Sequence, residues 1–323
     1  MKRNFVLVMG ALAATAMSAG AQAPGCTTGT TNAQRNACSA AVDLFNYMAP
    51  QLGAVIAGGN TTLGQGGAMG GIGHFAVSVR GNVLMGSLPQ IDKYDPVNPN
   101  NTSPRTIDVK DQILGLPAVD AAIGVFGGLP LGVTKVGGVD VLLNASYIPE
   151  YSGNGVSVKL PDGSLKIGYG ARVGILQEGL ATPGVGFSWV KRDLPTVDLG
   201  ATSGVNRFDV TGLEVKTTSW RLTASKSLIM FGLAAGIGQD SYESSGKVAA
   251  AVGPVATASP SLKQELTRTN YFADLSFNML VAKFVAEIGM VQGGDEIATY
   301  NTFTGKQADD SRLYGSVGLR IGF

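Results

Sequence analysis

The chain has 323 residues, of which 45% are hydrophobic and only 15% are charged, against about 25% charged in an ordinary globular domain. Its 46 glycines are roughly twice the average usage. This composition fits a cytoplasmic enzyme poorly. Because the chain has 24 basic and 23 acidic residues, there is no basic surplus to indicate a nucleic-acid partner.

Residues 1–23 predict a secretory signal peptide. Lys2 and Arg3 form a charged start, Phe5 to Met17 is apolar, and small residues offer cleavage sites after Ala21 and after Ala23. The apolar run is shorter than the roughly twenty residues that cross a bilayer as a helix, and no later stretch offers them. The mature chain is therefore expected to be exported, with no transmembrane helix and, without Lys2 and Arg3, a net charge of −1.

Residues 24–73 do not alternate and are predicted to form a separate amino-terminal segment. Asn32 to Ala49 carries apolar residues at helical spacing, which predicts a short amphipathic helix ended by Pro50. Gly53 to Gly73 is glycine-rich. Because its apolar side chains need shelter, we expect the segment to plug the barrel predicted below or to cover its periplasmic mouth, with a free tail as the alternative.

Both cysteines of the chain, Cys26 and Cys38, lie in this segment. A disulfide between them is the favoured interpretation for an exported protein, because an oxidising compartment preserves such pairs. A lipid anchor on Cys26 and two free thiols are the alternatives. A C-x-x-C metal or redox motif is absent from the sequence.

Residues 74–323 predict an all-β protein, an antiparallel up-and-down transmembrane β-barrel. Segments with alternating apolar and polar residues recur near 74–85, 119–125, 139–147, 165–175, 185–189, 220–224, 229–237, 270–277, 283–290 and 312–323. Short connections near 128–137, 177–182, 226–228 and 278–281 alternate with long ones at 87–117, 149–164, 193–217, 243–266 and 292–311. The pattern indicates about ten strands, within a range of 8–14, with short periplasmic turns, long outer loops and a periplasmic N-terminus. A hairpin arm or membrane pair at 205–215 and an early strand within 54–72 remain open.

The last segment, from Arg312 to Phe323, keeps its apolar residues on one face up to a terminal aromatic residue. It resembles the closing strand of Gram-negative outer-membrane β-barrel proteins. The resemblance implies an outer-membrane location and an assembly signal at Leu319, Ile321 and Phe323. It also implies contact with outer-membrane lipid and lipopolysaccharide, and with the barrel assembly machinery during biogenesis.

Alternation also predicts which polar side chains line the lumen: Arg80, Asp120, Asp140, Asn144, Lys166, Arg172, Arg221, Arg268, Asp274, Lys283, Glu287 and Arg320. Because both charge signs are nearly balanced and a small barrel is filled by its own side chains, pairing across the lumen is the favoured role. Conduction or ligand guidance is the alternative. Aromatic residues near strand ends are expected in interfacial girdles: Tyr147, Trp189, Trp220, Tyr242, Tyr271 and Phe323.

No catalytic residue, metal site or cofactor is predicted. The single histidine, His74, lies at the periplasmic start of the first strand, where a polar lumen or interface role is more common than that of a general base. We therefore expect a protein that is not an enzyme, and an outer-membrane hydrolase is the least favoured class.

The layout of an amino-terminal segment entering an exported monomeric barrel loosely resembles the long-chain fatty acid transporter family. That resemblance implies a channel or transporter for small or hydrophobic molecules, with a hydrophobic small molecule as partner. The alternative function is a closed structural or surface-interaction barrel that acts through its long outer loops.

Overall fold

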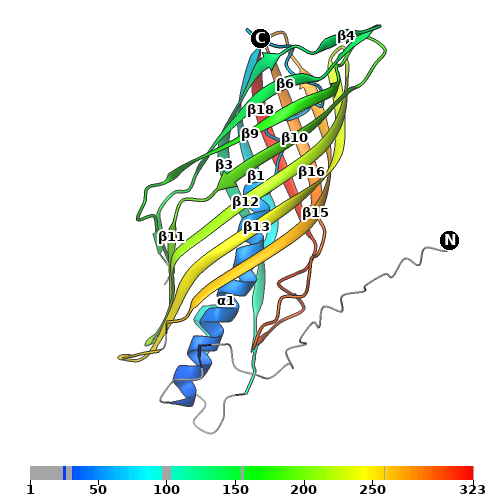
Figure 1. The fold of residues 1–323 in the computed structure, drawn as a ribbon. Coiled ribbons are helices and arrows are strands. Elements are labelled where there is room, and N and C mark those ends of the chain that lie inside the picture. Colours follow the sequence, from blue (N-terminus) through cyan, green and yellow to red (C-terminus); the bar gives the residue numbers. More distant parts are fainter. Residues whose placement is uncertain (1–24, 27–30, 97–102, 154–155, 258, 323) are drawn as a thin grey trace, which may run out of the picture.

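Ten antiparallel strands close into a barrel in the computed structural model, which describes residues 25–26, 31–96, 103–153, 156–257 and 259–322. Each strand pairs with its neighbours in the chain, and the last strand pairs with the first (Figure 1). The ring consists of β1 (Phe75–Pro89), β3 (Val109–Phe126), β6 (Gly138–Tyr147), β9 (Leu165–Leu176), β10 (Gly184–Asp193), β12 (Asn206–Leu228), β13 (Phe231–Val252), β15 (Ser261–Asn278), β16 (Ala282–Val291) and β18 (Arg312–Gly322). The predicted barrel and its count of ten strands are confirmed.

The barrel has a turn end, where β1 begins and β18 ends, and a loop end opposite. The short elements β4 (Leu129–Leu131) and β5 (Thr134–Val136) form a hairpin at the turn end. The loop end carries β2 (Thr106–Ile107), η1 (Ile91–Lys93), β7 (Tyr151–Gly153), β8 (Val156–Lys159), β11 (Val197–Ser203), β14 (Val255–Ala256) and β17 (Thr302–Phe303). Short and long connections therefore alternate as predicted.

Several strands run further toward the loop end than the sequence pattern predicted. β12 is continuous from Asn206, and its first half pairs with β11, so 205–215 is an arm of the wall and not an extra membrane pair. In this half Phe208, Val210 and Val215 face inward and are buried. The alternation persists here, but the inward residues are apolar. In the half of β12 nearer the turn end the inward residues are polar, as Arg221 is. A search for outward apolar residues therefore missed it.

The outer surface toward the turn end is apolar on every strand, as lipid contact requires. Leu233, Ile288 and Val317 are 56%, 65% and 51% exposed on this surface. Tyr169 and Trp189 contact each other on the outside, at ring centroids 6.2 Å apart, where a girdle is expected. Tyr242 contradicts the predicted girdle, because it is buried against Gly53 inside the barrel.

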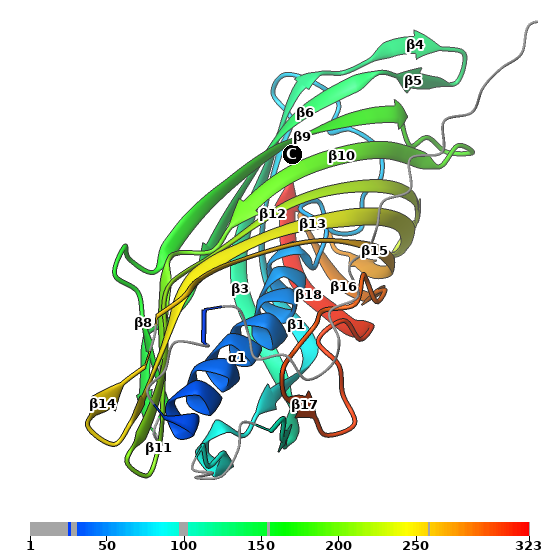
Figure 2. The same ribbon diagram turned by 60° about the horizontal axis from the view of Figure 1, so that its bottom comes forward.

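One helix, α1 (Asn32–Ala57), lies inside the barrel (Figures 1 and 2). Thr31 caps its start through a capping box with Gln34. The helix does not end at Pro50 as predicted but continues for two turns. Proline removes the N–H that would bond the Asn46 carbonyl, and the Gln264 side chain of β15 donates to that carbonyl instead, at 3.3 Å. No described helix is long and apolar enough to cross a membrane.

The chain passes through the lumen from the loop end to the turn end. Gly25 lies against Pro260, in the connection before β15 at the loop end. Gly71, at the other extreme, packs against Gly127 beside the turn-end hairpin. The described chain therefore starts at the loop end, opposite the end at which β1 begins. The range 54–72 contains no strand.

Candidate functional site: a filled lumen beneath an apolar pocket

The carboxyl end of α1 lies within the barrel, where three arginines of the wall surround it. Arg80 of β1 donates to the Gly58 carbonyl and Arg221 of β12 to the Ala57 carbonyl, each at 2.8 Å. Arg192 of β10 donates to the carbonyls of Ile56, Ala57 and Gly59 at 3.3, 2.9 and 3.1 Å. The last turn of α1 has no basic residue of its own. The wall thus supplies the cations that the negative end of the helix dipole and its unbonded carbonyls require.

The glycine-rich segment after the helix is bound mainly through its backbone. Carboxylates of the wall accept its N–H groups: Glu287 that of Asn60 at 3.2 Å, and Asp274 that of Gly64 at 3.0 Å. Asp140 accepts the N–H of Met69 at 3.0 Å. Arginines bond its carbonyls in turn, among them Arg320 to Leu63 and Arg172 to Gln65, both at 3.3 Å. The lumen charges are therefore arranged to match the main-chain groups of this segment.

The sequence predicted that charged residues pair across the lumen. In the structure they pair instead with charged residues of the neighbouring strand. The pairs are Arg80 with Asp120, Arg172 with Asp140 at 2.7 Å, and Arg221 with Asp240 at 2.7 Å. Asn144 donates to Asp120 at 2.7 Å and completes the first pair. The centre of the lumen is occupied by residues 32–73, so a side chain of one wall meets the segment before it reaches the opposite wall.

The structure also places the remaining predicted site residues. Lys166 is exposed, because β9 begins there at the loop-end rim, so it does not line the closed lumen. Arg192 and Asp240 do line the lumen, but the alternating segments used for the prediction stopped short of both. A longer window on each strand would have found them.

The two ends of the chain contain the other predicted features. Cys26 and Cys38 form a disulfide, which confirms the favoured pairing and ties the described start of the chain to the second turn of α1. Leu319 and Ile321 lie on the apolar outer face at 44% and 43% exposure. Phe323 lies outside the described residues.

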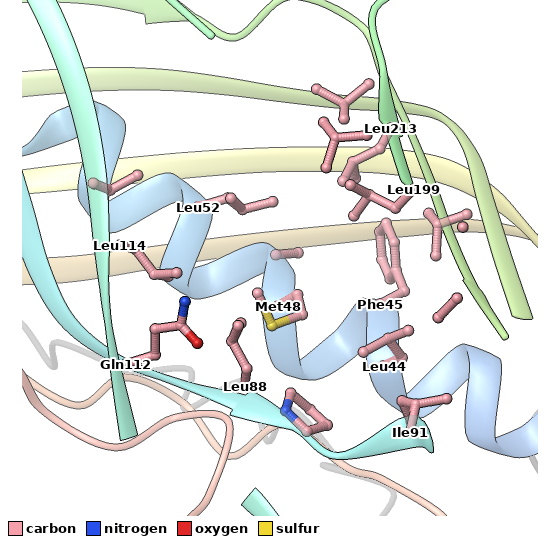
Figure 3. Close-up of a pocket in the computed structure, with 18 of the residues that line it drawn as sticks. Leu44, Phe45, Met48, Leu52, Leu88, Ile91, Gln112, Leu114, Leu199 and Leu213 are labelled. Atoms are coloured by element: carbon pink, nitrogen blue, oxygen red, sulfur yellow. The ribbon is translucent and has the colours of Figure 1, made fainter. Parts of the chain in front are cut away.

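An apolar pocket of about 730 Å³ lies at the loop end, between α1 and the wall (Figure 3). Leu44, Met48 and Leu52 follow one another at four-residue spacing on α1 and form the helix side of the pocket, and all three are only half-buried. Leu114 of β3 and Leu199 of β11 face them from the wall. Of its 27 lining residues four are polar, namely Gln90, Lys110, Gln112 and Thr202. The volume and the lining suit a small apolar molecule.

The pocket lies beside a low part of the barrel wall. β6 pairs with β3 only from Ala118 to Phe126, so residues 109–117 of β3 have no described strand on that side. β6 ends at Tyr147, and beyond the end of β10 at Asp193 the sheet continues from β12 through β11 and β8 only as far as β7, which is not paired with β3. Ile113 and Gly115, on this free edge, are among the lining residues. The pocket therefore reaches the side of the barrel as well as its loop end.

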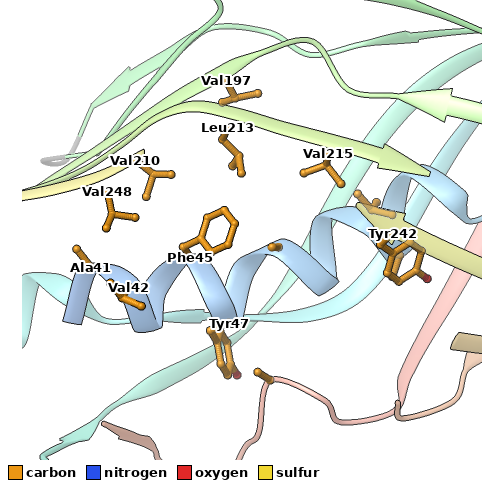
Figure 4. Close-up of a cluster of buried hydrophobic side chains, with 14 of the residues drawn as sticks. Ala41, Val42, Phe45, Tyr47, Val197, Val210, Leu213, Val215, Tyr242 and Val248 are labelled. Atoms are coloured by element: carbon orange, nitrogen blue, oxygen red, sulfur yellow. The ribbon is translucent and has the colours of Figure 1, made fainter. Parts of the chain in front are cut away.

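The side of α1 next to the pocket stripe is packed into the tall part of the wall, and its Phe45 also contributes to the pocket lining (Figure 4). Phe45, at 2% exposure, lies among Val210 and Leu213 of β12 and Val248 of β13. On a third side, Gln51 bonds both backbone groups of Ser87 in β1, at 2.8 and 3.0 Å. Since the other sides of the helix are covered, the pocket stripe is the part of α1 available to a ligand.

No group of three or more potential metal ligands occurs among the described residues. His74 is exposed at the turn end, and its N–H donates to the Gly71 carbonyl at 3.1 Å. The surroundings of His74 thus do not bring together a nucleophile, a base and an oxyanion site.

Comparisons with known proteins find barrels of several kinds. No family model matches the chain, and no curated protein matches it. Among solved structures, it is similar to the translocator domain of the autotransporter NalP from Neisseria meningitidis (11% identity, TM-score 0.39, covering 88% of this chain and 99% of that one). It is also similar to Ail, the attachment invasion locus protein of Yersinia pestis (11%, TM-score 0.28, 78% and 99%). A third is the toluene transporter TodX of Pseudomonas putida (9%, TM-score 0.25, 77% and 88%). These similarities lie at the level of the barrel.

Proposed function

We propose that this protein is an outer-membrane barrel that binds small apolar molecules at its outer end and serves in their uptake. The pocket between α1 and β3 is the observation that carries the proposal. A stripe of leucine and methionine left half-buried in an otherwise packed helix is costly in water, and an apolar ligand would cover it.

The location follows from the apolar outer belt, since a soluble barrel would not leave side chains such as Leu233 and Ile288 half or more exposed. With the lipid on that belt, the short turns face the periplasm and the long loops face outward. The signal peptide at 1–23 and the assembly signal at the last strand belong to the same proposal.

The filled lumen supports a side route for the ligand. An apolar molecule leaving the pocket toward the turn end would meet Arg80, Arg192 and Arg221 and the chain they hold. Burying a small hydrocarbon among charged groups gains nothing over water. The unpaired edge of β3 beyond the end of β6 leads out of the pocket without that obstacle.

Binding of naphthalene tests the proposal. We expect saturable binding to the protein in lipid nanodiscs, measured by fluorescence titration against empty nanodiscs. Leu52→Trp fills the pocket and should weaken binding by about tenfold or more, the equivalent of 1.4 kcal/mol. Leu233→Trp adds the same side chain on the outer belt and should leave binding unchanged. An affinity for naphthalene that Leu52→Trp leaves unchanged, or no saturable binding at all, would favour the closed surface-interaction barrel.

A further inference from the structure

Two carboxyl groups of the lumen differ from the others, because they have no arginine partner. Asp120, Asp140 and Asp240 each pair with an arginine. Asp274 of β15 and Glu287 of β16 are 3% and 4% exposed, and neither forms an ion pair among the described residues. A buried carboxylate without a compensating positive charge is strongly disfavoured. The two groups therefore require a positive partner of another kind.

The two carboxyl groups face each other. Asp274 and Glu287 are directly opposite partners on adjacent antiparallel strands, and their side chains lie within hydrogen-bond range of each other. Two carboxyl groups that share a buried site do not both ionise readily, because like charges repel strongly at low dielectric constant. A single proton between them would turn this repulsion into a strong hydrogen bond.

The glycine-rich segment fixes which oxygens are left for that proton. Oδ2 of Asp274 accepts the N–H of Gly64, and Oε2 of Glu287 accepts the N–H of Asn60. The second oxygen of each group, Oδ1 and Oε1, is buried and has no hydrogen-bond partner among the described residues. Such oxygens are rare in folded proteins. One proton held between Oδ1 and Oε1 gives both of them a partner.

A third buried oxygen lies beside these two groups. Tyr314 of β18 is 3% exposed, and its hydroxyl also has no hydrogen-bond partner among the described residues. This hydroxyl is 2.5 Å from the position of a Cβ built on Gly289, which is two residues from Glu287 on the inner face of β16. The hydroxyl is thus a neutral donor beside the one negative charge that two carboxyl groups with a single proton retain.

The charged side chains around the two carboxyl groups are engaged elsewhere or lie too far away. Arg221 of β12 pairs with Asp240 of β13, and Arg320 of β18 donates to the glycine-rich segment. Lys283 lies four residues from Glu287 along β16, which is about 13 Å in a strand. The glycine-rich segment itself has no charged side chain. A proton is therefore the simplest positive partner.

We propose that Asp274 and Glu287 form a proton-binding site, which holds one proton between the two carboxyl groups at neutral pH and so secures the glycine-rich segment to β15 and β16. The site is separate from the apolar pocket, and the segment stays in place when the proton is bound. When both groups ionise, at up to about pH 10, they repel each other and their hold on Gly64 and Asn60 weakens. The stabilising effect of the site is thus present at lower pH and is lost as pH rises.

Infrared spectroscopy tests the shared proton directly. At about pH 7.5, where Asp43 is ionised, we expect the carbonyl stretch of one protonated carboxyl group in the wild type, and its disappearance toward pH 10. Asp274→Asn and Glu287→Gln should each abolish this band, because an amide hydrogen replaces the shared proton. Asp240→Asn removes an arginine-paired carboxyl group and should leave the band unchanged. A wild-type spectrum without the band would overturn the proposal.

The stability of the barrel gives a second readout. At about pH 7.5, Asp274→Asn should lower the midpoint of urea unfolding in detergent much less than Asp240→Asn, which leaves Arg221 buried without its carboxylate. The wild-type midpoint should fall between pH 7.5 and about pH 10, and Asp274→Asn should lose at least half of that fall. An equal fall in both proteins would overturn the proposal. A wild-type midpoint that drops when a chelator removes calcium would mean a metal ion in place of the proton, and would overturn it too.

Discussion

Arg172 shows how one lumen side chain serves both the wall and the inserted chain. It pairs with Asp140 at 2.7 Å and donates to the Thr62 hydroxyl at 2.6 Å. Asp140 in turn accepts the N–H of Met69. This single ion pair therefore links β6 to β9 and also bonds the inserted segment at Thr62 and at Met69.

Replacing that arginine should destabilise the whole barrel. Arg172→Leu leaves Asp140 buried without its cation, a change that costs about 3–5 kcal/mol in buried pairs. We expect a lower midpoint of urea unfolding in detergent. The double variant with Asp140→Asn should recover part of the loss, since no unpaired charge remains, and Val173→Leu on the outer face should have little effect. An unchanged midpoint for Arg172→Leu would contradict a paired lumen.

At the residue scale, the sequence predicted which side chains face the lumen better than it predicted which groups they bond. Strand periodicity alone placed Arg80, Asp120 and Arg172 on the inner face, because alternation fixes which side a residue faces. Their partners include carbonyls of residues 56–65, which alternation within a strand cannot reveal. The same limitation explains why pairing across the lumen was expected.

At the scale of elements, the carboxyl group of Asp43 helps to dock α1 to the connection between β16 and β18, together with the Asn46 amide, which donates to the Ala298 carbonyl, and the Tyr47 ring, which contacts Phe303. Asp43 accepts the N–H groups of Tyr300 and Asn301 at 2.8 and 2.7 Å, and the Asn301 side-chain amide at 2.7 Å. Burial raises the pKa of Asp43 from 3.8 to about 6, against the opposing effect of these hydrogen bonds. This docking lies at the loop end, outside the apolar belt.

The raised pKa predicts that docking weakens as pH rises. A carboxyl group with a folded-state pKa above its unfolded value stabilises the fold most below pH 4, and this contribution is lost between about pH 4 and 6. The full difference is about 3 kcal/mol. Hydrogen exchange of residues 32–48 should therefore be slower at pH 4 than at pH 7, after correction for intrinsic rates. Asp43→Asn should remove this dependence, and an equal dependence in that variant would contradict it.

Three elements differ from their predicted extent, for two identifiable physical reasons. A helix was expected to end at Pro50, but Gln264 satisfies the carbonyl that proline leaves unbonded and the barrel packs the following turns. β12 and β13 were expected to end at the membrane, but their outer halves face a core inside the barrel and so invert their polarity. Both outcomes depend on contacts distant in sequence.

At the scale of the whole molecule, the periodicity of 74–323 predicted the closed barrel, its strand number and the alternation of turns and loops. The path of residues 25–73 was not predictable, because a helix and a glycine-rich segment carry no signal for direction inside a lumen. The pocket depends on that path, since α1 forms one of its sides. The account of function therefore rests on the inserted chain running from the loop end to the turn end.

Surface labelling of intact cells tests that path most directly. An epitope placed between Pro24 and Gly25 should bind antibody on intact cells, because the described chain begins at the loop end beside Pro260. A matched epitope after Leu280, in the turn between β15 and β16, should bind only after the outer membrane is permeabilised. An amino-terminal epitope that stays hidden until permeabilisation, alongside a folded barrel, would contradict the path and with it the pocket formed by α1.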